Sequence, residues 1–404
     1  MLRRPLAAVA VAGALGLAAS APAAAAPADS VRQQQDWVLG MLDVSDAWQL
    51  TEGANVTVAV IDSGVNPNVS DLTGVVRTGS DFTDLKTPSS NAHWGQHGTW
   101  MASIIAGRGN GVGDGIIGVA PKAKILSIRV IPDMNDPGYK KYDDEPENQI
   151  QSELAAGIRQ AVRDHAQVIS MSIGYSAPSG TVRAALQYAY DHGIVLVASA
   201  GNSGNNDEKH TGGAKHGFAP VSFPAEYPGV LSVGAVNIQR QPTSFSSGNL
   251  SVKVAAPGEG VPAQGRNGEF YTVNGTSPAC ALVAGVAALI KSKYPSLSPA
   301  KVMTALTTTA RQPMPGGAYN VLTGFGIVDA DAALHAAGKL ARQHPAASRV
   351  APSAHFGGGA AAIPAAPVAP RGPGPLVMFA LLAAVSLAAA GGGLAVLRRR
   401  PRHG

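Results

Sequence analysis

Residues 274–290 read Asn-Gly-Thr-Ser-Pro-Ala-Cys-Ala-Leu-Val-Ala-Gly-Val-Ala-Ala-Leu-Ile, so small polar residues run directly into an apolar segment. The pattern predicts a helix that begins near Ser277. Pro278 is tolerated in its first turn because that position has no helical hydrogen-bond partner. Free amides and the positive end of the helix dipole favour negative charge there, which suits a nucleophilic serine. A capped core helix of small residues is the alternative, and this segment taken alone favours it.

Short apolar runs alternate with helical patterns through the central region of the chain. The first run, residues 56–61, reads Val-Thr-Val-Ala-Val-Ile and ends in Asp62-Ser63-Gly64. Strands that alternate with helices predict an α/β fold, with a mainly parallel sheet covered on both faces. The other strand candidates are residues 125–131, 168–173, 194–198, 230–236 and 252–255, and the helical patterns cover residues 97–107, 149–165 and 180–192.

Three polar residues stand at the ends of these elements. Asp62 follows a strand, where open α/β sheets place their active sites. His97 opens a helical pattern, and Asn202 follows the strand candidate 194–198, from which its amide can donate a hydrogen bond into a cleft. For Asp62 and Asn202, the alternative is an ordinary turn residue that bonds to local backbone.

Together with Ser277, these residues supply what nucleophilic acyl transfer requires. The reaction needs a serine, a base that takes its proton, and a carboxylate that orients the base and stabilises its charged form. It also needs donors for the tetrahedral oxyanion, which the Asn202 side chain and the Ser277 backbone N–H would provide. The sequence therefore predicts a catalytic triad of Asp62, His97 and Ser277.

The local sequences resemble the subtilisin family of serine proteases, and so does the chain order Asp, His, Ser. The matching motifs are Val-Ile-Asp-Ser-Gly around Asp62, His-Gly-Thr-x-x-Ala-x-x-Ile-Ala-Gly from His97, Ala-Gly-Asn at Asn202 and Gly-Thr-Ser-x-Ala from Gly275. The resemblance covers residues 37–335. It implies a three-layer sandwich with a seven-stranded, mainly parallel sheet, and serine endopeptidase activity.

The resemblance also implies a role for each matching residue. Asp62 would orient the imidazole, His97 would act as base and then as acid, and Ser277 would be the nucleophile. Asn202 would donate to the oxyanion. Two further segments match those that line the substrate cleft and pair with the peptide backbone, namely Ser172-Ile173-Gly174 and Ser199-Ala200-Gly201. Ala281 replaces a proline that is common in the family, and we expect little effect because a helix start accepts either residue.

Both ends of the chain carry targeting patterns. Residues 1–28 combine two arginines, an apolar run and small residues, as in a secretory signal peptide. Residues 376–397 form an uncharged run of 22 residues, about 33 Å long as a helix, which is enough to cross a bilayer within a predicted transmembrane segment 375–397. The basic tail 398–404 predicts a cytoplasmic C-terminus. We therefore expect a single-pass cell-membrane protein whose peptidase domain, residues 50–335, is extracytoplasmic.

The short arm at residues 29–49, a Pro/Ala/Gly-rich linker at 336–374 and the anchor together resemble mycosins, the membrane-anchored subtilisin-like proteases of type VII secretion systems. The arm's Gln35-Asp36-Trp37-Val38-Leu39 and Ala47-Trp48 resemble the mycosin N-terminal extension. Mycosins often carry disulfides, which this chain cannot form internally because Cys280 is its only cysteine. The resemblance implies protein or peptide substrates and a type VII secretion complex as partner. A mainly structural role in such a complex is the alternative.

Composition argues against other classes of partner. The 404 residues carry a net charge of +5, yet the region between Asp29 and Asp331 holds all 26 acidic residues and only 21 of the 31 Lys and Arg residues. The basic balance therefore comes from the two ends and does not indicate a nucleic-acid partner. We expect no cofactor and no metal at His93 and His97, although structural calcium is an alternative for the acidic loop Asp143, Asp144, Glu145 and Glu147.

Overall fold

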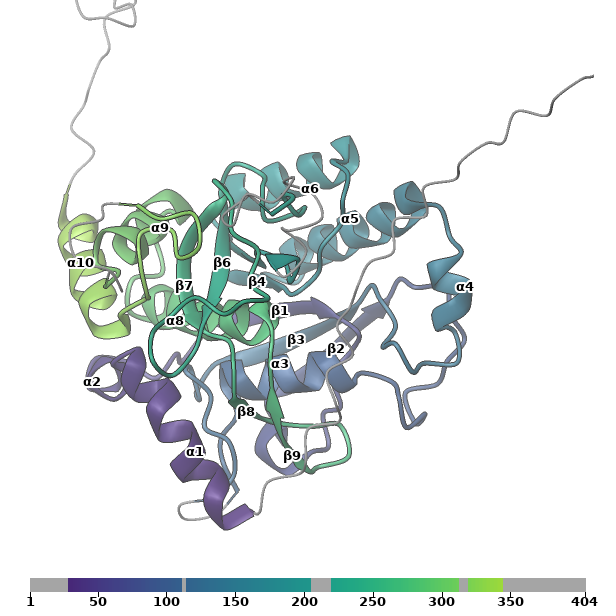
Figure 1. Cartoon of the computed structure of the whole chain (residues 1–404), viewed down its shortest axis with the longest axis horizontal. Helices are drawn as coiled ribbons and strands as arrows, with labels where there is room; N and C mark the ends of the chain where they lie inside the picture. The colour runs from purple at the N-terminus through teal and green to yellow at the C-terminus, as the bar shows by residue number, and fades with distance from the viewer. Residues whose placement is uncertain (1–27, 111–113, 205–218, 312–318, 344–404) are drawn as a thin grey trace, which may run out of the picture. The chain divides into compact units, whose positions relative to one another are not determined.

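The computed structural model describes residues 28–110, 114–204, 219–311 and 319–343 (Figure 1). Within those ranges, no helix is both long enough and apolar enough to cross a membrane. The predicted transmembrane segment 375–397 and almost all of the predicted signal peptide lie outside the described residues.

A seven-stranded sheet forms the centre of the molecule, and every neighbouring pair of strands in it is parallel. This confirms the α/β fold with a parallel seven-stranded sheet. The strand order is β2-β3-β1-β4-β5-β6-β7. The strands are β1 (Thr57–Asp62), β2 (Val76–Asp81), β3 (Lys124–Arg129), β4 (Val168–Met171), β5 (Val195–Ser199), β6 (Val230–Val236) and β7 (Val252–Pro257).

Helices cover both faces of the sheet, so the domain has three layers. In β1, Val58 and Val60 belong to the apolar core shared with α3 (Gln96–Ala106) and α8 (Thr276–Lys293). The alternate residues of β1, Ala59 and Ile61, belong to the core shared with α5 (Glu147–Arg163) and α6 (Gly180–Asp191). Successive strand side chains point to opposite faces, which explains this division. The remaining elements are α1 (Ala28–Met41), α2 (Val44–Trp48), η1 (Ser70–Leu72), α4 (Tyr139–Asp143), α9 (Pro299–Thr308), α10 (Ala330–Arg342) and the hairpin of β8 (Val261–Gln264) and β9 (Phe270–Val273).

Helix α8 runs through one of these cores and is buried over most of its length. Its five alanines and its glycine, Gly285, keep it thin enough to lie against several strands at once. At Gly285, an added Cβ would come within 2.6 Å of the Val119 side chain, closer than real Cβ atoms approach their neighbours. The small-residue pattern that predicted this helix is therefore a packing requirement, and it fixes the position of Ser277 in the helix's first turn.

The N-terminal arm packs against the peptidase domain through side-chain contacts to backbone. Gln35 donates to the carbonyl of Ile117 over 2.6 Å and accepts from the Ile117 N–H over 3.0 Å. The Trp48 indole donates to the carbonyl of Val119 over 2.8 Å. Apolar residues of α1 and α2 join the same core as α3 and α8, so the arm is part of the folded unit.

The folded part of the chain continues beyond the boundary predicted at His335. Helix α10 ends at Arg342, so residues 336–342 are helical and do not belong to the extended linker that was predicted from Ala336 onward. The Asp329 side chain accepts from the Ala332 N–H over 2.8 Å and caps the helix. Ala333, Leu334 and Ala337 are buried in the core. The sequence did not predict this helix because its alanine-rich composition resembles that of the following linker.

Candidate active site

Asp62 and His97 meet at the carboxyl edge of the sheet. Asp62 is the last residue of β1, and His97 lies in the first turn of α3. His97 Nδ1 and Asp62 Oδ1 are 2.8 Å apart, and Asp62 is 1% exposed. The Ser63 N–H also donates to Oδ1 over 2.7 Å. Because Nδ1 faces the carboxylate, the other ring nitrogen of His97 is left to face a nucleophile.

Two glycine contacts allow this close approach of β1 and α3. A Cβ at Gly98 would lie 2.1 Å from the backbone oxygen of Gly64, and a Cβ at Gly64 would lie 2.6 Å from the Trp94 ring. Gly64 also has φ 99°, a conformation that side-chain-bearing residues rarely adopt. The glycine that follows His97 is therefore required for the histidine to reach Asp62.

Neighbouring charges set the proton affinity of His97. Burial alone lowers its pKa, but the charge and hydrogen bond of Asp62 and the charge of Asp133 outweigh burial and raise the pKa above its usual value. A general base must be neutral before it can accept a proton. The two carboxylates therefore stabilise the imidazolium that forms when His97 takes a proton from a nucleophile.

Asn202 is tied to the beginning of α8. Its Oδ1 accepts from both the backbone N–H and the hydroxyl of Thr276, each over 2.9 Å. The Thr276 hydroxyl in turn accepts from the Gly201 N–H over 3.2 Å. Since the carbonyl end of the amide is used in this way, its NH₂ end is directed away from Thr276 and can donate to another group.

The two predicted substrate segments follow neighbouring parallel strands at the same edge. Ser172-Ile173-Gly174 follows β4, and Ser199-Ala200-Gly201 lies at and after the end of β5. The Ser172 hydroxyl donates to the carbonyl of Ser277 over 3.3 Å, so the first segment is joined to the start of α8. Ile173 and Ala200 are buried, whereas Gly174 is exposed. Their roles in substrate binding remain predictions.

The described residues show a hydrogen bond between His97 and Asp62 but none between the His97 and Ser277 side chains. Ser277 is half-buried in the first turn of α8. Bonds between base and nucleophile are often long in unliganded proteases and shorten when substrate binds.

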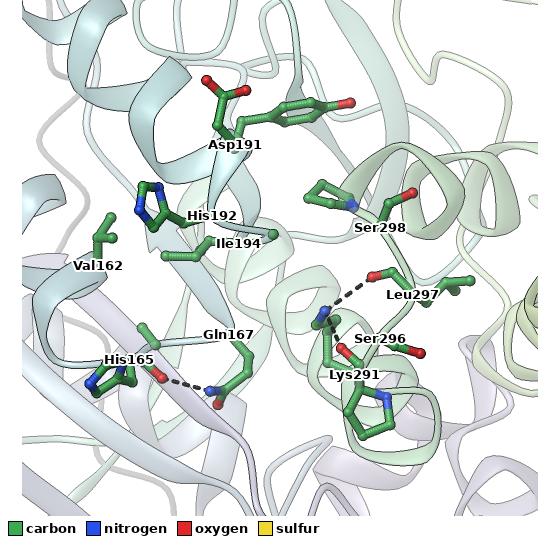
Figure 2. Close-up of a pocket in the computed structure, with 15 residues that line it drawn as sticks. Val162, His165, Gln167, Asp191, His192, Ile194, Lys291, Ser296, Leu297 and Ser298 are labelled. Carbon is green, nitrogen blue, oxygen red and sulfur yellow. Dashed lines mark hydrogen bonds between the residues drawn. The ribbon is translucent and has the colours of Figure 1, made fainter.

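The described part of the chain contains no group of three or more His, Cys, Asp or Glu side chains that could hold a metal ion. A cavity of about 640 Å³ lies at the opposite edge of the sheet, near the starts of β4 and β5 (Figure 2). Lys291 in its lining donates to the carbonyls of Pro295 and Leu297. The lining contains none of the predicted catalytic residues.

Comparison with known proteins defines the class. Residues 53–345 match the subtilase family, peptidase family S8. The chain therefore belongs to the subtilase family, and it is a subtilisin-like serine protease.

Relatives within that family include both subtilisins and mycosins. Subtilisin DY of Bacillus licheniformis is 36% identical over 259 residues, which are 64% of this chain and 85% of that protein. Mycosin-1 of Mycobacterium tuberculosis is 35% identical over 334 residues, with 74% of this chain and 72% of that protein covered. A solved structure of the serine protease MycP1, described as an essential component of the type VII (ESX-1) secretion system, is 35% identical with a TM-score of 0.61, covering 74% of this chain and 88% of that one. This chain is thus related to the mycosins.

Proposed function

We propose that this protein is a membrane-anchored, extracytoplasmic serine endopeptidase that processes proteins of a type VII secretion system. The observation that carries the catalytic part is the 2.8 Å contact between buried Asp62 and His97, at the sheet edge where α8 begins. The similarity to MycP1 supports the secretion part.

In this proposal, His97 removes the hydroxyl proton of Ser277 as the serine attacks the scissile carbonyl. Asp62 holds the imidazole and stabilises its protonated form. The resulting oxyanion accepts from the Ser277 backbone N–H and from the Asn202 side chain, which Thr276 orients. His97 then gives its proton to the leaving amine. In the second half of the reaction, His97 takes a proton from the water that attacks the acyl-enzyme and returns it to the Ser277 oxygen as the acyl product leaves.

The proposed location rests on the sequence. A cleaved signal at residues 1–28 and a span at 375–397 would hold the peptidase domain outside the membrane, with a cytoplasmic C-terminus. Substrates would then be proteins or peptides that pass close to the membrane surface.

A structural role in a secretion complex is the second candidate, because MycP1 is named as an essential component of its system. Secretion in a Ser277→Ala strain should be compared with secretion in a strain that lacks the gene. We expect the Ser277→Ala strain to lose processing of its substrates. Normal secretion in that strain, with loss of secretion only in the deletion strain, would favour the structural role.

A further inference from the structure

The first turn of α3 is held by a carboxylate from a distant part of the chain. Asp133 accepts from the Gln96 N–H over 2.7 Å through one oxygen and from the His97 N–H over 2.9 Å through the other. The residue in the N-cap position, Gly95, has no side chain that could do this. A carboxylate at this end of a helix bonds to free amides and interacts favourably with the helix dipole. One side chain therefore fixes the backbone of His97 itself.

The loop that carries Asp133 is anchored by a buried ion pair. Arg129, the last residue of β3, is 2% exposed and donates to Asp136 over 2.7 Å. Asp136 also accepts from the Thr87 hydroxyl over 2.7 Å and from the Gly138 N–H over 2.8 Å. Arg129 is paired with Asp62 in the register of β3 and β1. The ion pair thus connects the strand beside Asp62 to the loop of Asp133.

The opposite side of the same turn is held by the β8–β9 hairpin. Arg266 donates to the carbonyl of Trp94 over 2.6 Å, and its N–H donates to the Gln96 side chain over 3.1 Å. The charge of Asp133 acts on Arg266 as well as on His97. The charges that act on His97 are those of Asp62 from β1 and Asp133 from the loop after β3. Arg266 interacts with Asp133, and Arg129 pairs with Asp136.

We propose that Asp133 is a positioning residue for the triad, which holds the backbone of His97 so that its ring lies against Asp62. This rests on the proposed function of Asp62, His97 and Ser277, because it assigns a supporting residue to that same site. Asp133 does not touch the reacting atoms. It acts through the two amides at the start of α3 and through its charge.

Two effects of Asp133 can be separated by substitution. Asparagine retains one acceptor oxygen, so Asp133→Asn keeps part of the backbone support but loses the charge, whereas Asp133→Ala loses both. Small displacements of a catalytic group lower turnover strongly, and we expect kcat/KM to fall about tenfold in Asp133→Asn and up to about a hundredfold in Asp133→Ala. Both variants should lower the pKa of His97, because each removes a negative charge that favours the imidazolium.

The test measures the pKa of His97 by NMR titration of the full-length protein in detergent. The protein carries Ser277→Ala, which prevents self-cleavage, and its histidines are labelled with ¹³C. His97→Gln identifies the resonance. The matched control is Asp144→Asn, which removes one carboxylate from an exposed position at the end of α4. The pKa of His97 should fall with Asp133→Asn and stay unchanged with Asp144→Asn.

An unchanged His97 pKa in Asp133→Asn, or the same shift in Asp144→Asn, would overturn the proposal. The titration does not depend on catalysis, so it remains informative if Ser277 proves not to be the nucleophile. In protein with Ser277 intact, the acidic limb of kcat/KM against pH should move to lower pH in Asp133→Asn. A general loss of stability would lower kcat/KM without moving that limb.

Discussion

The hydroxyl of Thr276 offers a graded test of the oxyanion site. Thr276→Val keeps the shape of the side chain but removes the hydroxyl that donates to Asn202 and accepts from Gly201. The backbone N–H of residue 276 still donates to Asn202 over 2.9 Å, so the amide loses one of two restraints. One net hydrogen bond contributes about 0.5–1.5 kcal/mol, which corresponds to a two- to tenfold loss in kcat. Asn202→Ala removes the donor itself, and loss of one such donor costs about 10²–10³ in subtilisin.

The assay is steady-state hydrolysis of a chromogenic peptide by the two single variants and the double variant. Because the oxyanion exists only after attack begins, we expect kcat to fall while KM changes little. Thr276→Val should have almost no further effect on kcat in the Asn202→Ala background, since its role depends on the amide. Independent losses that multiply in the double variant would refute this reasoning, and so would a Thr276→Val effect confined to KM.

Asp136→Asn should lower the melting temperature by about 5–10 °C, because it leaves buried Arg129 with only the half-exposed Asp81 as its carboxylate partner. Glu52→Gln breaks the exposed ion pair with Lys122 and should change the melting temperature by less than about 2 °C. Equal shifts of the two variants in a thermal melt would contradict the larger contribution of the buried pair. Burial and then the charges of nearby carboxylates raise the pKa of Glu153 to about 7. The folded state then binds this proton more tightly than the unfolded state, so stability should decrease as pH rises from about 4.5 to about 7. Glu153→Gln should remove that loss and stabilise the protein by about 1–3 kcal/mol at pH 8, and a thermal melt series without such a gain would disprove the assignment.

Buried strands were predictable from sequence because their side chains are apolar on both faces. Residues 230–236 were predicted as a strand and form β6 with the same bounds, every residue buried. β2 was missed because it is an edge strand whose sequence, Val-Arg-Thr-Gly-Ser-Asp, leaves most side chains exposed. The hairpin of β8 and β9 was missed for a related reason, since the residues of β9 are mostly half-buried and mixed in character.

The site was predictable only where a residue's role shows in its local sequence. Asp62 and His97 each end or begin an element, and the structure brings them together. Asp133 carries no such signal, because its loop reads as an ordinary turn and its partners lie 36 and 37 residues away along the chain. Thr276 stood within the motif around Ser277, but only its contact with Asn202 shows what its hydroxyl does.

The nucleophilic character of Ser277 can be measured directly with a fluorophosphonate, which forms a covalent adduct only with an activated serine. Folded full-length protein, Ser277→Ala protein and heat-denatured protein are labelled in parallel, digested and examined by mass spectrometry. We predict one adduct, on the peptide that contains Ser277, in the folded protein alone. Folded protein that carries no adduct on Ser277 would contradict the assignment of this residue as the nucleophile.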